Sequence, residues 1–80
     1  MTIEEIYTCI NCTIIKCKDY GFDDLAERFD DALHLGSSGL EILGAIRNVL
    51  EDEKSKANKL IGKGRVQEII DFVEFSYGMK

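Results

Sequence analysis

The stretch GFDDLAERFDDALH, residues 21–34, decides the fold that we expect of this chain. Wound at about 100° per residue, it becomes a helix with an apolar side and an acidic side. The apolar side consists of Leu25, Ala26, Phe29, Ala32 and Leu33. The acidic side consists of Asp23, Asp24, Glu27, Asp30 and Asp31. Such a helix buries one side in a core and presents the other to solvent, so the sequence predicts a helical protein with one strongly anionic surface.

Negative charge is concentrated around this helix. With Asp19 included, residues 19–31 hold six carboxylates and one base, Arg28, a net charge of −5 that equals the formal charge of the whole 80-residue chain. A surface of this kind attracts cationic partners and repels nucleic acids and anionic membranes. The alternative is a solvated surface that only keeps the protein soluble, although surfaces of mixed sign do so more commonly. Tyr20 and Phe22, at the preceding turn, either anchor a partner or belong to the core.

Apolar residues recur at helical spacing before this stretch as well. The first helix is expected to begin at Thr2, which fits a capping box with Glu5, and to be stopped by Gly21. Its inner stripe is Ile3, Ile6, Ile10, Thr13, Cys17 and Tyr20, widened by Tyr7 and Ile14. A strand at residues 12–17, CTIIKC, is the alternative because β-branched residues favour sheets. The helical spacing holds for about five turns, so we prefer the helix.

The helix predicted at residues 21–34 starts at Asp23 or Asp24 and ends near Leu35–Gly36. Two further helices are expected after it. Residues 39–52 form the third helix, and Ser38 with Glu41 is a second candidate for a capping box. Its stripe is Leu40, Leu43, Ile46, Val49 and Leu50, with Ile42 towards one edge. The fourth helix covers residues 65–77, with Val66, Ile69, Ile70, Val73 and Tyr77 facing inward and Gly78 closing it.

Residues 54–65, KSKANKLIGKGR, are the only basic segment of the chain. Gly62 and Gly64 predict a loop or a frayed extension of the third helix, which Leu60 and Ile61 hold against the core. The chain has no proline and no Asn-Gly or Asp-Gly pair to form a tight hairpin. The sequence therefore predicts an all-α, single-domain protein of residues 1–80, either a four-helix bundle or an irregular four-helix fold.

Several features bear on where the protein acts. The N-terminal residues MTIEEIYTC carry two acids where a signal peptide carries bases. No apolar run approaches the roughly 20 residues that cross a bilayer. We therefore expect a cytoplasmic protein whose three cysteines remain thiols.

The cysteines form the first candidate site. Cys9 and Cys12 make a C-x-x-C pair, Cys17 follows, and His34 offers a fourth ligand for zinc. Within one helix, however, Cys12 lies about 140° away from Cys17, so the thiols do not converge on one ion. A redox pair is also disfavoured because the C-x-x-C does not stand at the start of a helix after a strand. Small buried thiols are the better interpretation, and we expect no metal and no cofactor.

Nucleic-acid binding and catalysis are the next candidates. Ala32, Gly36 and Ile42 have the spacing of a helix-turn-helix, which any tight helical hairpin shares. Acidic helices would repel phosphates, so we expect no nucleic-acid partner. His34, close behind Asp30, is better explained by a surface ion pair than by an acid–base dyad. No catalytic motif occurs, and an enzyme is not expected.

A cytosolic, acidic, proline-free helical protein of this size resembles the small immunity proteins of bacterial toxin systems, including contact-dependent inhibition systems. The tyrosine pair of the nuclease-colicin immunity proteins is replaced here by Leu40-Glu41-Ile42-Leu43. The resemblance implies a stoichiometric inhibitor that binds a cognate toxin domain, often a basic nuclease, and blocks its active site or substrate surface.

From the charge pattern we expect this partner to bind at Asp23, Asp24, Glu27, Asp30, Asp31 and His34. The alternative function is a helical adaptor or regulator that dimerises or docks on a partner through the third helix.

Overall fold

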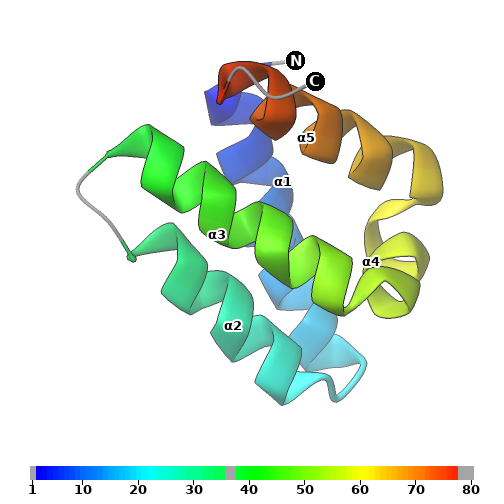
Figure 1. Ribbon diagram of the computed structural model, residues 1–80. Coiled ribbons are helices and arrows are strands. Elements are labelled where there is room, and N and C mark those ends of the chain that lie inside the picture. The colour runs from blue at the N-terminus through cyan, green and yellow to red at the C-terminus, as the bar shows by residue number, and fades with distance from the viewer. Residues whose placement is uncertain (1, 36–37, 78–80) are drawn as a thin grey trace.

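Five helices form in the part of the chain that the structure describes (Figure 1). The structure, a computed structural model, describes residues 2–35 and 38–77. The helices are α1 (Ile3–Asp19), α2 (Asp23–Leu33), α3 (Gly39–Asp52), α4 (Lys54–Ile61) and α5 (Lys63–Ser76). These residues contain no strand. The all-α prediction is confirmed, whereas the predicted number of four helices is wrong.

The first helix begins as its sequence predicts. The backbone N–H of Glu5 donates to Thr2 Oγ1 at 3.2 Å, and the Thr2 N–H donates to Glu5 Oε1 at 2.9 Å, which completes the capping box. Residues 12–17 continue the helix, so the strand alternative is wrong. Gly21 follows with a φ of 79°, a conformation that a residue without a Cβ adopts at little cost.

The basic segment is where the helix prediction fails. Lys54–Ile61 is a helix of its own, α4, because lysine, alanine and leucine favour helix and the segment has an apolar side to bury. Ala57 and Leu60 are buried, and Gly62, with a φ of 107°, separates α4 from α5. Gly64 lies inside the first turn of α5, so it does not mark a loop.

The remaining boundaries differ from prediction by a few residues. α2 ends at Leu33, before the predicted end near Leu35–Gly36, and α5 starts two residues before the predicted Arg65. Gly36 and Gly78 lie outside the described residues. The bounds of α3 match the prediction, and Ser38 Oγ accepts a hydrogen bond from the Glu41 N–H at 3.3 Å.

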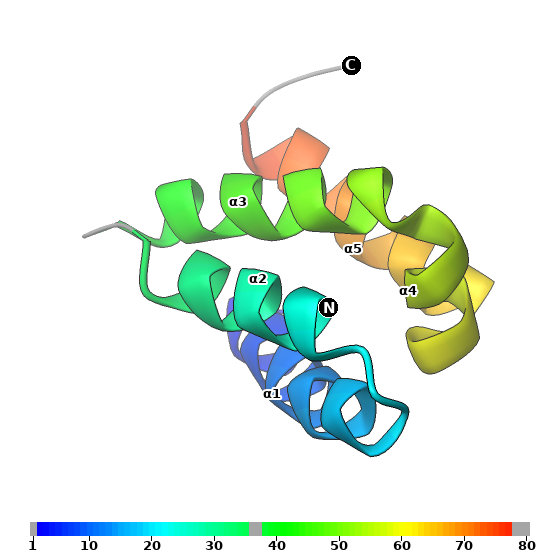
Figure 2. The same cartoon turned by 90° about the horizontal axis from the view of Figure 1, so that it is seen from below.

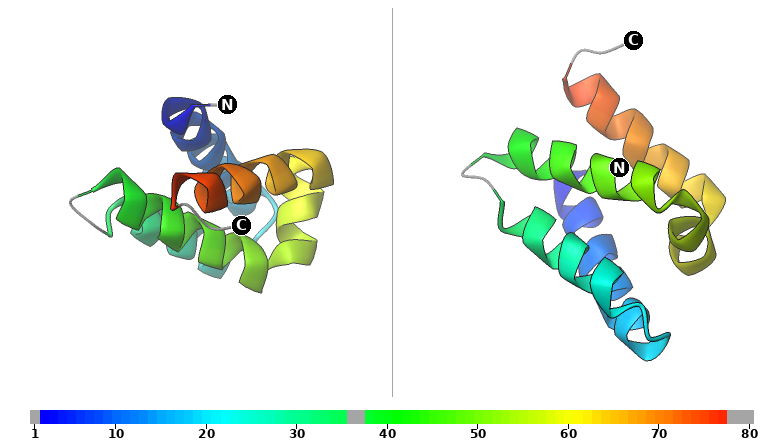
Figure 3. Two further views of the ribbon diagram at one scale, coloured as in Figure 1. Left: turned by 45° about the horizontal axis from the view of Figure 1, so that its top comes forward. Right: turned by 60° about the horizontal axis from the view of Figure 1, so that its bottom comes forward.

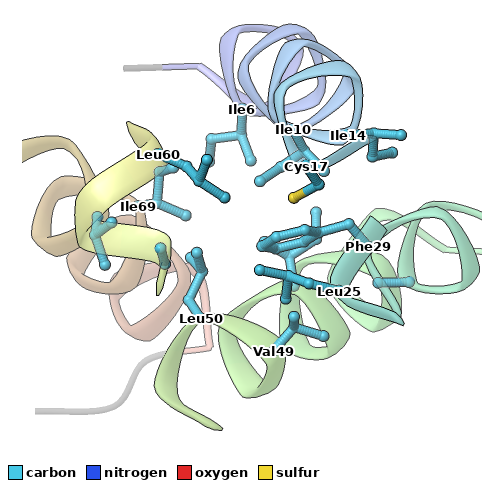
Figure 4. Close-up of a cluster of buried hydrophobic side chains, with 14 of the residues drawn as sticks. Ile6, Ile10, Ile14, Cys17, Leu25, Phe29, Val49, Leu50, Leu60 and Ile69 are labelled. Atoms are coloured by element: carbon cyan, nitrogen blue, oxygen red, sulfur yellow. The ribbon is translucent and has the colours of Figure 1, made fainter. Parts of the chain in front are cut away.

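All five helices contribute to one hydrophobic core, with Phe29 of α2 among its largest fully buried side chains (Figure 4). The close-up shows side chains from every helix converging around this ring, among them Ile10 and Cys17 from α1, Leu50 from α3, Leu60 from α4 and Ile69 from α5. Thr13, buried on α1, donates its hydroxyl to the Cys9 carbonyl at 2.8 Å. A buried hydroxyl on this stripe is therefore satisfied within its own helix.

Three residues assigned to inner stripes lie at the surface instead. Tyr20 is 59% exposed because it lies just beyond the end of α1, and Leu40, in the first turn of α3, is 46% exposed. Tyr77 is also exposed, and its hydroxyl donates to the Leu40 carbonyl. Tyr77 can approach α3 closely because Gly44 has no side chain at the point of contact.

The helices are arranged so that α2 packs between α1 and α3, while α5 packs on the other side of α3 (Figures 1 and 2). α4 lies beyond the C-terminal end of α3 and links it to α5 (Figure 3). Its own contacts are with α1, α3 and α5. Among the described residues, no helix combines the length and apolarity that a membrane crossing requires.

The central position of Phe29 gives a stability prediction. Phe29→Ala should lower the free energy of unfolding by about 3–5 kcal/mol, because it removes buried apolar contacts and leaves a cavity. The matched control is Phe75→Ala on α5, where the ring is 83% exposed and a change within about 0.5 kcal/mol is expected. Urea unfolding followed by circular dichroism measures both. Equal losses in the two variants would contradict the assigned core.

The turn between α1 and α2 gives a second stability prediction. Gly21→Ala should destabilise the protein by about 1 kcal/mol, because the left-handed conformation brings a Cβ against the following carbonyl. Gly64→Ala, in α5 with open space around it, should be neutral or stabilising by about 0.5 kcal/mol. The melting temperatures of the two variants measure these effects. A Gly21→Ala variant that is more stable than the unchanged protein would contradict the left-handed conformation of Gly21.

Candidate protein-binding surface on α2

The sequence predicts an acidic side for the helix at residues 21–34, and the structure places all five of its carboxylates on the exposed side of α2. We call this set the acidic surface: Asp23, Asp24, Glu27, Asp30 and Asp31. The opposite side of the helix carries the buried residues Leu25, Ala26, Phe29 and Ala32. Packing of these residues against α1 and α3 fixes the rotation of the helix, so the carboxylates point into solvent.

No lysine or arginine within residues 2–35 and 38–77 forms an ion pair with the acidic surface. Arg28, the base nearest to it in sequence, turns towards the end of α3. Its guanidinium lies 2.8 Å from the Asp52 carboxylate and 3.9 Å from that of Glu53. The acidic surface therefore keeps its negative charge within the described fold.

His34 follows the acidic surface at the C-terminal end of α2. Its Nδ1 lies 2.8 Å from the Asp30 carbonyl oxygen and 3.7 Å from the Asp30 carboxylate. The predicted contact with Asp30 is thus present. The ring is exposed and closes the last turn of α2, and it helps to line a groove of about 210 Å³ together with Tyr7, Asn11 and Ile42.

The two aromatic residues before α2 have different environments. Phe22 is half-buried against the core, as the core alternative predicts, whereas Tyr20 is exposed. The two rings meet edge to face with centroids 6.0 Å apart. Lys56 Nζ lies 5.2 Å from the centre of the Phe22 ring and Lys59 Nζ lies 5.9 Å from that of Tyr20. These cation–π contacts attach α4 to the turn and direct both lysines towards rings rather than carboxylates.

An apolar feature beside the acidic surface was not predicted from the sequence. Leu35 is 65% exposed and helps line a shallow groove of about 280 Å³ between α2 and α3. Asp31 lies on one side of this groove, and Ala45 and Val49 of α3 on the other. Leu35 follows the periodic part of α2, and its role depends on how α2 and α3 pack, so the pattern of α2 alone did not identify it.

The cysteines lie in three different environments, in keeping with their angular spread along one helix. Cys17 is buried and Cys9 is half-buried, but Cys12 is exposed, so the prediction of small buried thiols is wrong for Cys12, which lies on the side of α1 that faces away from the core. None of the three is in a disulfide. Burial raises the pKa of the Cys17 thiol, against the opposing charge of Lys56. Over the described ranges, no cluster of three histidine, cysteine or acidic side chains has a geometry that holds a metal ion. The chain matches no protein-family model, no curated protein and no solved structure.

Thiol reactivity tests these positions. Near pH 8, iodoacetamide should modify Cys12 first, whereas Cys9 and Cys17 should react at least about tenfold more slowly. Burial hinders access to both thiols and raises their pKa, so a smaller fraction is thiolate at a given pH. Peptide mass spectrometry follows each site, with denatured protein as the control in which the three rates converge. Rapid modification of Cys17 in the folded protein would contradict its burial.

Proposed function

We propose that the chain is a stoichiometric protein inhibitor that acts in the cytoplasm and neutralises a cognate, basic toxin domain through the acidic surface of α2. The observation that carries the proposal is the exposed row of five carboxylates with no lysine or arginine paired to it in the described fold. A toxin that acts on nucleic acid needs a cationic substrate surface, and a rigid acidic helix is complementary to such a surface. An inhibitor bound there excludes the substrate.

The energetics of α2 support a binding role. Glu27 lies four residues from both Asp23 and Asp31, so like charges face one another along the helix and destabilise it. Asp23 and Asp24 gain from the helix dipole at the N-terminus, but Asp30 and Asp31 lie towards the negative end. A cationic partner would relieve this repulsion, so part of the binding energy comes from strain in the unbound protein.

The groove beside Asp31 provides an apolar contact surface, which the charges of α2 alone do not. Interface energy is concentrated in a few buried apolar or aromatic anchors, while exposed charges mainly raise the association rate. Leu35 and the neighbouring groove between α2 and α3 offer a small apolar depression next to the carboxylates. We assign the partner's apolar anchor to this depression.

The decisive experiment begins with the partner. A secreted protein encoded next to this chain, with a toxic C-terminal domain, should arrest growth when that domain is expressed alone. Co-expression of the chain should restore growth, and the purified pair should form a one-to-one complex. A toxic domain that is neither bound nor neutralised would overturn the proposal for that pair.

Charge reversal then tests the surface. Asp23→Lys, Asp30→Lys and Asp31→Lys together change the formal net charge from −5 to +1. They should slow association at least about tenfold at low salt and reduce its salt dependence. The matched control reverses Glu41, Glu68 and Asp71, which reaches the same net charge from other helices and should retain most of the rate. Stopped-flow measurement distinguishes the two, and equal slowing in both would assign the effect to net charge alone.

A single neutralisation separates binding from stability. Asp31→Asn should stabilise the free protein by about 0.3 kcal/mol, because it removes a like charge near the C-terminal end of α2. The same change should weaken binding to the toxin domain. Chemical unfolding and calorimetric titration measure the two effects. A variant that loses both stability and affinity would assign Asp31 a structural role instead.

One observation favours the alternative of a docking adaptor. Leu40 of α3 is exposed close to Tyr77, and Phe75 near the end of α5 is the most exposed large apolar side chain within residues 2–35 and 38–77. Exposed aromatic residues are common anchors of protein interfaces. An adaptor of this kind would be insensitive to charge reversal on α2 and would lose its partner on Phe75→Ala.

A further inference from the structure

A second groove, of about 510 Å³, lies on the side of α1 that faces α4 and the start of α5. Cys9, Cys12 and Lys16 line it from α1, and Leu60, Ile61 and Arg65 line it from the other helices. No residue of α2 lines it, so it is separate from the acidic surface. Its volume falls within the range of sites that hold small molecules.

Two cations, Lys16 and Arg65, line this groove. Within the described residues, neither Lys16 nor Arg65 forms an ion pair with an acid. Lys16 Nζ donates to the Leu60 carbonyl at 3.3 Å, which holds the ammonium at the wall and leaves its other protons available. Burial raises the pKa of the Cys9 thiol, while the charges of Arg65 and Lys16 both oppose that rise. Both cations therefore act on the same point of the groove.

The groove also contains acidic residues. Glu4 and Glu5 also line it, and Lys16 follows them by eleven or twelve residues, about 17 Å along a helix axis. An anionic head group is attracted to Lys16 and Arg65, whereas a second negative charge near Glu4 and Glu5 would be repelled. Ile61, which is half-buried, provides most of the apolar surface beside the cations, because Leu60 is only 4% exposed.

We infer that this groove binds a small monocarboxylate with a short apolar tail. The carboxylate lies between Lys16 and Arg65, and the tail lies against Leu60 and Ile61. A guanidinium matches a carboxylate with paired N–H donors, and the tail removes apolar surface from water. The site needs no partner protein, so a failure of this inference and a failure of the proposed inhibitor function can be distinguished.

Octanoate is the probe for the test, followed by two-dimensional NMR on the intact protein. Saturable shifts should appear at the groove residues, with a Kd on the order of millimolar, as expected for about ten non-hydrogen atoms in an open site. Arg65→Gln should weaken binding about tenfold through loss of a charge-assisted contact. Lys63→Gln, which removes an exposed charge outside the groove from the same helix, should leave the Kd unchanged.

Two further probes and a chemical readout complete the test. Acetate should bind too weakly to saturate because it has no tail. Octylamine should not shift the signals of Lys16 and Arg65, because its cationic head is repelled by these residues and attracted to Glu4 and Glu5 instead. Octanoate should also slow the alkylation of Cys12, and Arg65→Gln should reduce this protection. Failure of octanoate to saturate, equal binding of octylamine at Lys16 and Arg65, or an Arg65→Gln variant with unchanged affinity would each overturn the inference.

Discussion

The burial of Phe29 and its neighbours on one side of α2 is the constraint from which the functional surface follows. The helix packs against α1 and α3, and its apolar side is covered by both. At 100° per residue, the sequence then leaves no freedom in where Asp23, Glu27 and Asp30 point. Rotation of α2 that turned these carboxylates inward would bury unpaired charge at a cost of several kcal/mol per ion. The core and the acidic surface are thus two sides of one packing arrangement.

The carboxylates of the acidic surface remain uncompensated although the chain contains enough lysine and arginine side chains to pair with them. Five exposed bases lie in Lys54–Arg65, yet two of them, Lys56 and Lys59, sit over the rings of Phe22 and Tyr20. Arg28 pairs with Asp52 at the far end of α3, and Arg47 pairs with Glu51 and Glu74. Within the described residues, these cations are engaged elsewhere, and no other lysine or arginine forms an ion pair with the acidic surface. Individually these contacts contribute little to stability, but together they decide which charges remain uncompensated.

The sequence predicted the strongly amphipathic helices well, because their apolar stripes extend over three or more turns. The Thr2 cap, the bounds of α3 and the orientation of α2 all follow from local patterns. It failed at Lys54–Ile61, where eight residues are too few to establish a period and two nearby glycines favoured a loop. Tyr20, Leu40 and Tyr77 were misplaced at helix ends, where periodicity no longer determines burial. The groove at Leu35 and the one at Lys16 and Arg65 depend on how helices pack, which no single segment encodes.

The helical structure of residues 54–61, which the sequence did not predict, matters for function. It keeps the acidic surface separate from the groove that Lys16 and Arg65 line. A loop at residues 54–65 would have let flexible lysines reach the carboxylates of α2. As a helix, α4 buries Ala57 and Leu60, and the lysines project from a fixed backbone. The carbonyl of Leu60 at its end holds Lys16, and the next helix supplies Arg65. The same short helix thus helps to keep the negative charge of α2 uncompensated and to form the groove that Lys16 and Arg65 line.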